Sequence, residues 1–141
     1  MRELQITNYE SCGEPAESIR IGDAGRKREL GMIAEEYAGH YLQACGYMVE
    51  HCNWRYKHHE LDLVIRDAKQ QLVFIEVKAA QAPFDPIQHF SDRKQRDFKA
   101  AIGDYLEQYQ LWEETFSADL VTISLATDYS IYSLAHYDNV I

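Results

Sequence analysis

The segment that most constrains the fold is residues 72–78, which read Leu-Val-Phe-Ile-Glu-Val-Lys. Apolar side chains occupy both alternating faces of an extended strand here, which is typical of a central strand in a sheet. An acid and an amine are costly in that setting unless they are paired or bind an ion. Glu76 and Lys78 therefore require a chemical explanation.

The segments around this strand alternate between helical and extended patterns. Apolar residues at helical spacing predict one helix over about residues 26–45 and a second that begins after Ser91, a plausible N-cap, and ends near residue 112. This order of elements indicates an α/β fold in which helices flank a mixed sheet. The remaining strands are predicted over residues 47–53, 60–65 and 120–125, and a last extended stretch over 129–135.

Residues 1–25 show little periodicity and are expected to be a tail or an irregular lead-in to a single domain over residues 26–141. Several tyrosines, a tryptophan and a cysteine continue the helical stripes, and they are expected in the core rather than in a site, with the cysteine as a small buried apolar residue. These core candidates are Tyr37, Tyr41, Cys45, Tyr105, Tyr109 and Trp112.

The net charge of −9 argues against a generic nucleic-acid binder, but the charge is unevenly distributed. Residues 1–25 have a net charge of −3 and residues 104–141 a net charge of −7, whereas residues 26–103 have a net charge of +1. Because the middle of the chain holds nearly all the Lys and Arg, a local phosphate-binding face remains open.

No apolar run approaches the roughly 20 residues of a membrane span, so the chain is expected to be soluble, cytoplasmic and without a membrane partner. Three cysteines without a CxxC pair favour a reducing compartment over a disulfide framework. Cys52 lies among His51, His58 and His59, but the closely paired ligands of a structural zinc site are missing. A zinc site at these residues is therefore disfavoured.

Acidic residues two apart mark the strand at 60–65, and an acid and a lysine two apart mark the next strand. Residues two apart share a face of a strand, so pairing of the strands would gather Glu60, Asp62, Glu76 and Lys78. Two or three carboxylates can hold Mg²⁺ or Mn²⁺ through oxygen ligands, with an amine beside them to orient water or phosphate. The structural alternative is an ordinary solvated ion pair on an exposed strand face.

Several further residues extend this pattern along the chain. They are Glu35 in the first helix, Asn53-Trp54-Arg55, Glu60 to Val64, Val73 to Lys78, Lys94 and Asp119. This succession, over about residues 26–125, resembles the YraN-type family of small bacterial proteins. That family is similar to the restriction-endonuclease-like PD-(D/E)xK superfamily, and among its members to Holliday-junction resolvases.

The resemblance implies a three-layer α/β/α core with a central mixed sheet of four to five strands. It implies that Asp62, Glu76, the Val77 carbonyl and Glu35 hold Mg²⁺ or Mn²⁺, and that Lys78 is the catalytic lysine. Asp62, Glu76 and Glu35 would also count as catalytic residues, with Glu60 in support. Lys94 would match a basic position at the start of the second helix.

The basic stretch after residue 54 adds candidate DNA contacts. Arg55 and Lys57 could clamp phosphates, and Trp54 and Tyr56 could stack on bases. The chain departs from the family pattern at His59, where glycine is common, and at Ala80, where a basic residue is common.

Two functions follow from these observations. The first is a metal-dependent nuclease that hydrolyses DNA, with branched or single-stranded DNA as candidate substrates and a homodimer as a candidate assembly. The alternative is a catalytically silent nucleic-acid-binding or protein-interaction module on the same fold.

Overall fold

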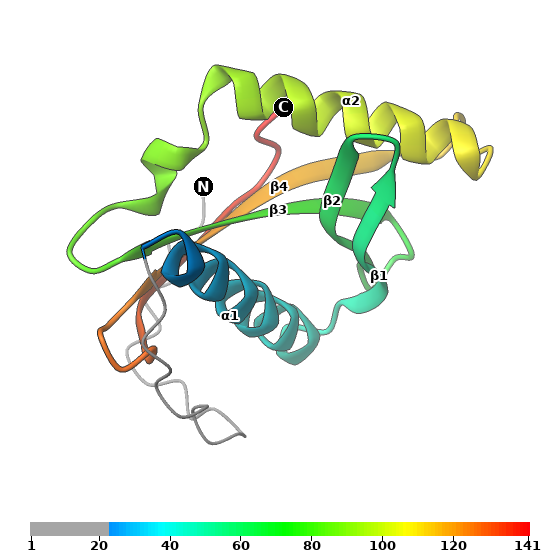
Figure 1. The fold of residues 1–141 in the computed structure, drawn as a ribbon. Coiled ribbons are helices and arrows are strands. Elements are labelled where there is room, and N and C mark those ends of the chain that lie inside the picture. The colour runs from blue at the N-terminus through cyan, green and yellow to red at the C-terminus, as the bar shows by residue number, and fades with distance from the viewer. Residues whose placement is uncertain (1–22) are drawn as a thin grey trace.

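The computed structural model of the chain describes residues 23–141, so most of the expected lead-in at 1–25 lies outside the described residues. The described part contains two α-helices, one short 3-10 helix and five strands, shown in Figure 1. Their bounds are α1 Asp23–Ala44, β1 Met48–Tyr56, β2 His59–Arg66, β3 Leu72–Gln81, η1 Pro86–His89, α2 Asp92–Gln108, β4 Phe116–Leu125 and β5 Ile131–Tyr137.

The strands form one mixed sheet in the order β1-β2-β3-β4-β5. The pairing is antiparallel everywhere except between β3 and β4, which run parallel and are connected through α2. Helices α1 and α2 cover opposite faces of this sheet (Figure 1). The predicted α/β class, with a three-layer arrangement around a mixed sheet, is therefore confirmed.

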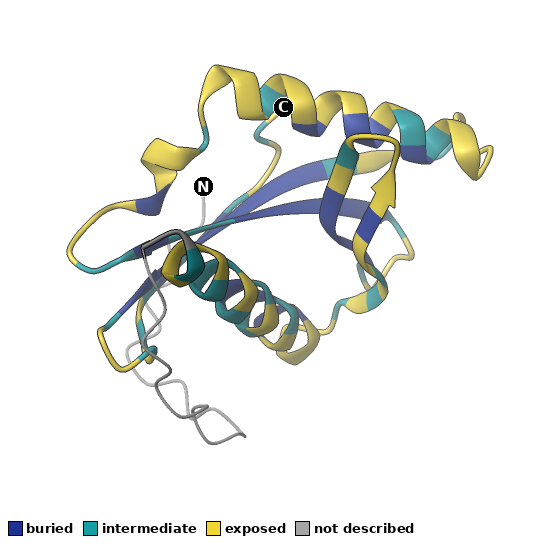
Figure 2. Ribbon diagram, in the orientation of Figure 1, coloured by how far each residue is buried: buried dark blue, intermediate teal, exposed yellow. Residues whose placement is uncertain are grey.

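Alternation along β3 explains why this strand is apolar almost throughout. Val73, Ile75 and Val77 belong to the core under α1, whereas Leu72 and Phe74 belong to the core under α2. Figure 2 shows β3 and β4 buried along most of their length, with the buried stripes of both helices turned toward the sheet. By the same alternation, Glu76 and Lys78 lie on the α2 face.

The sheet splits between β2 and β3. Their antiparallel ladder runs from Arg66 opposite Leu72 to Leu63 opposite Ile75 and ends there. The parallel ladder of β3 with β4 continues to Gln81. The part of β3 that carries Glu76 and Lys78 is therefore paired on the β4 side, while β2 diverges from its other side.

The β1–β2 hairpin is longer than predicted and contains two left-handed residues. Asn53 has φ 51° within β1, and Lys57 has φ 54° in the turn. His59 is an ordinary strand residue, so the glycine of the family pattern is not required for backbone conformation at this position. Its imidazole instead contacts the carboxylate of Asp104, which ties the hairpin to α2.

Three core predictions were wrong near the ends of helices. Cys45 follows the last residue of α1 and is exposed. Helix α2 ends at Gln108 rather than near residue 112, so Tyr109 and Trp112 are 40% and 60% exposed. The other stripe residues agree with the prediction, since Tyr41 and Tyr105 are buried and Tyr37 packs against the α1 core.

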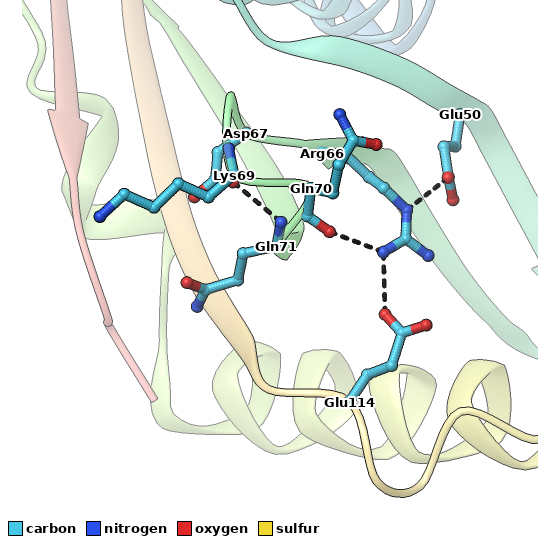
Figure 3. Close-up of polar contacts among 7 residues, drawn as sticks. All are labelled: Glu50, Arg66, Asp67, Lys69, Gln70, Gln71 and Glu114. Carbon is cyan, nitrogen blue, oxygen red and sulfur yellow. Dashed lines mark hydrogen bonds and ion pairs between the residues drawn. The ribbon is translucent and has the colours of Figure 1, made fainter.

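Arg66 anchors the end of the sheet where β2 and β3 are still paired (Figure 3). Its Nε donates to Glu50 at 2.6 Å, and its Nη1 donates to Glu114 at 2.8 Å and to the Gln70 carbonyl at 2.8 Å. The guanidinium therefore links β1, the β2–β3 turn and the segment before β4. These hydrogen bonds to two carboxylates raise the pKa of Arg66.

Candidate functional site

The split between β2 and β3 brings together side chains from three elements. Asp62 comes from β2, Glu76 and Lys78 come from β3, and Glu35 comes from α1. Glu35 follows the buried Ala34 and is itself half-buried, so its carboxylate reaches the sheet from the α1 side. The charges of Asp62 and Lys78 both act on its pKa, which places these groups near one another.

Asp62 lies at the point where the β2–β3 ladder ends. Its side chain is buried, and its Oδ2 accepts a hydrogen bond of 2.8 Å from the backbone N–H of Val77. The carboxylate thus replaces the backbone partner that a continued ladder would have supplied. The N–H and C=O of one strand residue point to the same edge, so the Val77 carbonyl also faces the split.

Glu76 and Lys78 form a close ion pair in this split. The Lys78 Nζ lies 2.6 Å from the Glu76 Oε1, and the side chains are 16% and 12% exposed, respectively. Burial of a pair is tolerated when the charges satisfy one another. The alternative of a solvated pair on an exposed strand face is therefore wrong for these two residues.

Burial, together with neighbouring charges, shifts the pKa values of these carboxylates. Burial, followed by the charge of Glu76, raises the pKa of Asp62 to about 7. Burial, followed by the charges of Asp62 and Glu60, raises the pKa of Glu35 to about 7. Burial also raises the pKa of Glu76, although Lys78 opposes the shift. A cation beside these acids would relieve both their repulsion and their desolvation.

Lys78 responds in the opposite sense to the same surroundings. Burial alone would lower the pKa of Lys78, but the nearby charges of Glu76, Asp62 and Glu60 outweigh it and raise the pKa. The amine therefore stays protonated at neutral pH, where it can act as a hydrogen-bond donor and a positive charge.

Asn53 is a residue of this region that the sequence analysis did not single out as functional. Its side chain hydrogen-bonds Glu35, which opposes the rise in the pKa of that carboxylate. It stands opposite Asp62 in the β1–β2 register, between the pairs Cys52–Leu63 and Trp54–Leu61. Its sequence signals were its place in the Asn53-Trp54-Arg55 segment of the family resemblance and the tolerance of Asn for left-handed backbone inside an extended segment.

The predicted basic residues are divided between two places. The charge of Lys94, in the first turn of α2, acts on Glu76, so this lysine lies near the carboxylates. Arg55 is exposed, and its Nε lies 3.5 Å from the Oε2 of Glu60, the second residue of β2. The Lys57 Nζ lies 5.2 Å from the centre of the Tyr56 ring at the hairpin turn.

Of the two aromatic candidates for base stacking, the structure leaves one accessible. Trp54 is buried and makes an edge contact with Tyr105, so its availability for stacking was predicted wrongly. Tyr56 stacks on Trp54 with 6.1 Å between ring centres and is 38% exposed.

A second group of ionisable residues lies elsewhere on the sheet. The ligand atoms of Asp119, His136 and Asp138 lie within 4.8 Å of one another and could hold a metal ion. Across residues 23–141, no other three His, Cys, Asp or Glu residues meet that distance, so Glu35, Asp62 and Glu76 do not. Sequence patterns did not reveal this group, because Asp119 lies 17 residues before His136 and the three residues match no common metal-ligand spacing.

Residues 34–123 match the model of the Uncharacterised protein family UPF0102, which is more than half of the chain. The chain belongs to this family. UPF0102 is the YraN family, a restriction-endonuclease-like group, so the resemblance drawn from the motifs is confirmed. The matched range includes Glu35, Asp62, Glu76 and Lys78, whereas His136 and Asp138 follow it.

Individual UPF0102 proteins are similar over much of their length. A UPF0102 protein of Chloroflexus aurantiacus is 35% identical over 85 residues, covering 60% of this chain and 69% of its own. One from Thermotoga maritima is 35% identical over 78 residues, covering 55% and 71%. One from Marinobacter nauticus is 34% identical over 99 residues, covering 69% and 80%.

Neither helix of the described part is both long and apolar enough to cross a membrane.

Proposed function

We propose that this UPF0102 chain is a divalent-metal-dependent nuclease that hydrolyses phosphodiester bonds in DNA. The observation that carries the proposal is the meeting of Asp62, Glu76, Lys78 and Glu35 at the split between β2 and β3. Three crowded carboxylates beside one protonated amine are costly to bury, and a divalent cation would offset that cost.

The donor set fits a hard cation. Carboxylate oxygens of Asp62 and Glu76 and the Val77 carbonyl are the oxygen ligands that Mg²⁺ and Mn²⁺ prefer, with Glu35 completing the shell. When bound, such an ion would polarise the phosphate and lower the pKa of a bound water.

The side chains of this chain would then divide the remaining work. Lys78 would hold the attacking water or a phosphate oxygen through its ammonium hydrogens, with its position fixed by Glu76. Glu35 would support the metal shell, with its carboxylate oriented by the hydrogen bond from Asn53. Lys94 would pair with a phosphate on the α2 side of the split.

The hairpin would contribute contacts to the substrate further from the reacting phosphate. Arg55 and Lys57 are exposed there, and Tyr56 offers an aromatic face beside Lys57. Such a surface suits DNA with splayed or unpaired bases, so branched and single-stranded DNA are the proposed substrates. The proposed setting is the cytoplasm, with a homodimer as the candidate assembly.

One observation favours the alternative, a catalytically silent binding module. The carboxylate oxygens of Glu35, Asp62 and Glu76 are not gathered within 4.8 Å, and Lys78 already neutralises Glu76. In that case the cluster would be a structural ion-pair network, and the net charge of −9 would favour a protein partner over DNA.

The test is a cleavage assay with labelled single-stranded, duplex and four-way-junction DNA in Mg²⁺, in Mn²⁺ and in EDTA. Lys78→Ala and Asp62→Asn should abolish cleavage, while Lys69→Ala should cleave like the parent. Lys69 is a suitable control because it is an exposed lysine in the β2–β3 turn, at the far end of these strands (Figure 3). Metal-dependent cleavage that survives in Lys78→Ala would refute the assignment, and no cleavage together with no Mn²⁺ binding would support the silent module.

A further inference from the structure

We propose that Asp119, His136 and Asp138 bind one zinc-class transition-metal ion on the α1 face of the sheet. This site is separate from the proposed nuclease centre. Asp119 alternates with Val121 and Ile123, which belong to the core under α1, whereas Glu76 and Lys78 lie on the α2 face.

The donor atoms already stand at distances close to those of a metal shell. The His136 Nε2 lies 2.8 Å from the Asp119 Oδ2 and 3.6 Å from the Asp138 Oδ1. Two ligands, each about 2.1 Å from a tetrahedral zinc ion, stand about 3.4 Å apart. The two observed separations bracket this value, so small shifts of the side chains would admit an ion.

The two buried ligands, Asp119 and His136, are held in place by neighbouring groups that would not bind the ion. Asp119 turns its other oxygen, Oδ1, toward the Ser117 hydroxyl and the Asn139 N–H, with the latter at 3.1 Å. The Tyr41 hydroxyl lies 3.3 Å from the Nδ1 of His136, the ring nitrogen that would not bind the ion. Outer contacts of this kind fix the orientation of metal-binding carboxylates and imidazoles.

Two of the three ligands are buried and the third is exposed, which gives a metal ion a route from solvent. The side chains of Asp119 and His136 are only 5% and 6% exposed, whereas Asp138 is 42% exposed. An ion could therefore enter past Asp138, with water as its fourth ligand, as in zinc sites that keep an open position.

The ligand chemistry distinguishes this site from the carboxylate cluster. One imidazole with two carboxylates suits Zn²⁺ and its transition-metal neighbours, whereas all-oxygen sets suit Mg²⁺ and Mn²⁺. Binding needs the Nε2 of His136 free of a proton, so a neutral imidazole would carry its single proton on Nδ1, toward the Tyr41 hydroxyl.

The test uses the full chain carrying Asp62→Asn, so that an ion at the proposed nuclease centre is not counted. After removal of metal with a chelator, Zn²⁺ is titrated by calorimetry and Co²⁺ by visible absorption. We expect one Zn²⁺ per chain and the visible bands of four-coordinate Co²⁺. In Asp138→Asn the affinity should fall at least about tenfold, because removing even an outer-shell partner typically costs that much.

Asp97→Asn is the matched control, since Asp97 is an exposed acid on α2, and it should bind Zn²⁺ as the background protein does. His136→Ala should abolish Zn²⁺ binding. If that variant does not fold, Asp138→Asn still tests the proposal, because Asp138 is exposed. No uptake of Zn²⁺, or an affinity unchanged in Asp138→Asn, would show that the contact between Asp119 and His136 is a structural hydrogen bond only. That result would overturn the proposal without bearing on DNA cleavage.

Discussion

Replacing Asp62 with Asn should make the ion-free protein more stable at alkaline pH, although it removes a proposed metal ligand. The amide oxygen of Asn can still accept the hydrogen bond that Val77 donates to Asp62. The two side chains have nearly the same size, so packing changes little. What disappears is a negative charge that burial and the charge of Glu76 both disfavour.

The magnitude follows from the pKa of Asp62, which rises from 3.8 to about 7 on folding. One pKa unit corresponds to about 1.4 kcal/mol, so the full penalty on the charged form is about 4 kcal/mol. Because Glu76 titrates together with Asp62, protonation of one relieves the other, and we expect a net gain of about 2 to 3 kcal/mol.

The sign of the pH dependence is set by the direction of the shift. Between pH 3.8 and about 7 the folded state holds a proton on Asp62 that the unfolded state has released. Stability therefore falls as pH rises through this window and levels off above it. The advantage of Asp62→Asn should be nearly absent at about pH 4 and complete at about pH 8.

The assay is urea unfolding in EDTA across this pH range, followed by the fluorescence of Trp54 and Trp112. Asp97→Asn should follow the parent at every pH, because its carboxylate is exposed. Asp62→Ala should be less stable than Asp62→Asn at every pH, since it also leaves the buried N–H of Val77 without an acceptor, at a cost of about 1 to 3 kcal/mol. The reasoning fails if Asp62→Asn is less stable than the parent at pH 8, or if their difference does not change with pH.

Three further predictions test other parts of the structure. Arg66→Lys should lower the free energy of unfolding, measured by urea denaturation, by about 2 kcal/mol, because lysine cannot hold Glu50 and Glu114 together. The control Arg93→Lys, on the exposed face of α2, should change it by less than about 0.5 kcal/mol. Asn53→Ala should lower both thermal stability and Mn²⁺ affinity, while Asn53→Gly, which accepts φ 51°, should lower Mn²⁺ affinity alone. Equal Mn²⁺ affinity in both variants and the parent would exclude a role for Asn53 in holding Glu35. Mn²⁺ affinity should fall about tenfold per pH unit below pH 7 for each proton that competes at Asp62 or Glu35. Calorimetry should give the same Mn²⁺ affinity at pH 6 and pH 8 if these acids do not bind the ion.

The fold could be predicted because its central elements have strong and uninterrupted patterns. Helix α1 and strand β3 each bury a regular set of apolar residues, and the sequence pattern located both. The errors lie where the backbone changes conformation without a clear signal. Gln110 adopts φ 56° just after α2, so Tyr109 and Trp112 keep helical spacing in sequence although the helix has ended.

The proximity of Asp62 and Glu76 could be predicted from strand alternation and hairpin pairing alone. The contact between Asn53 and Glu35 could not, because it depends on how α1 packs against a strand with a left-handed residue. The approach of His136 to Asp119 also depends on a tertiary feature, the register that sets Leu120 opposite Tyr137 in β4 and β5. Sequence spacing holds no information on that register until the turn between the strands is known.

The split in the sheet explains how acids from both of its faces can interact. In a continuous sheet, the backbone ladder would separate Glu35 on the α1 side from Glu76 on the α2 side. Here the β2–β3 ladder ends at Leu63 and Ile75, and the side chain of Asp62 takes the next backbone donor. At this position a side chain, rather than a backbone ladder, connects the two strands. The same carboxylate that ends the ladder therefore also lets the two faces share one cluster of charges.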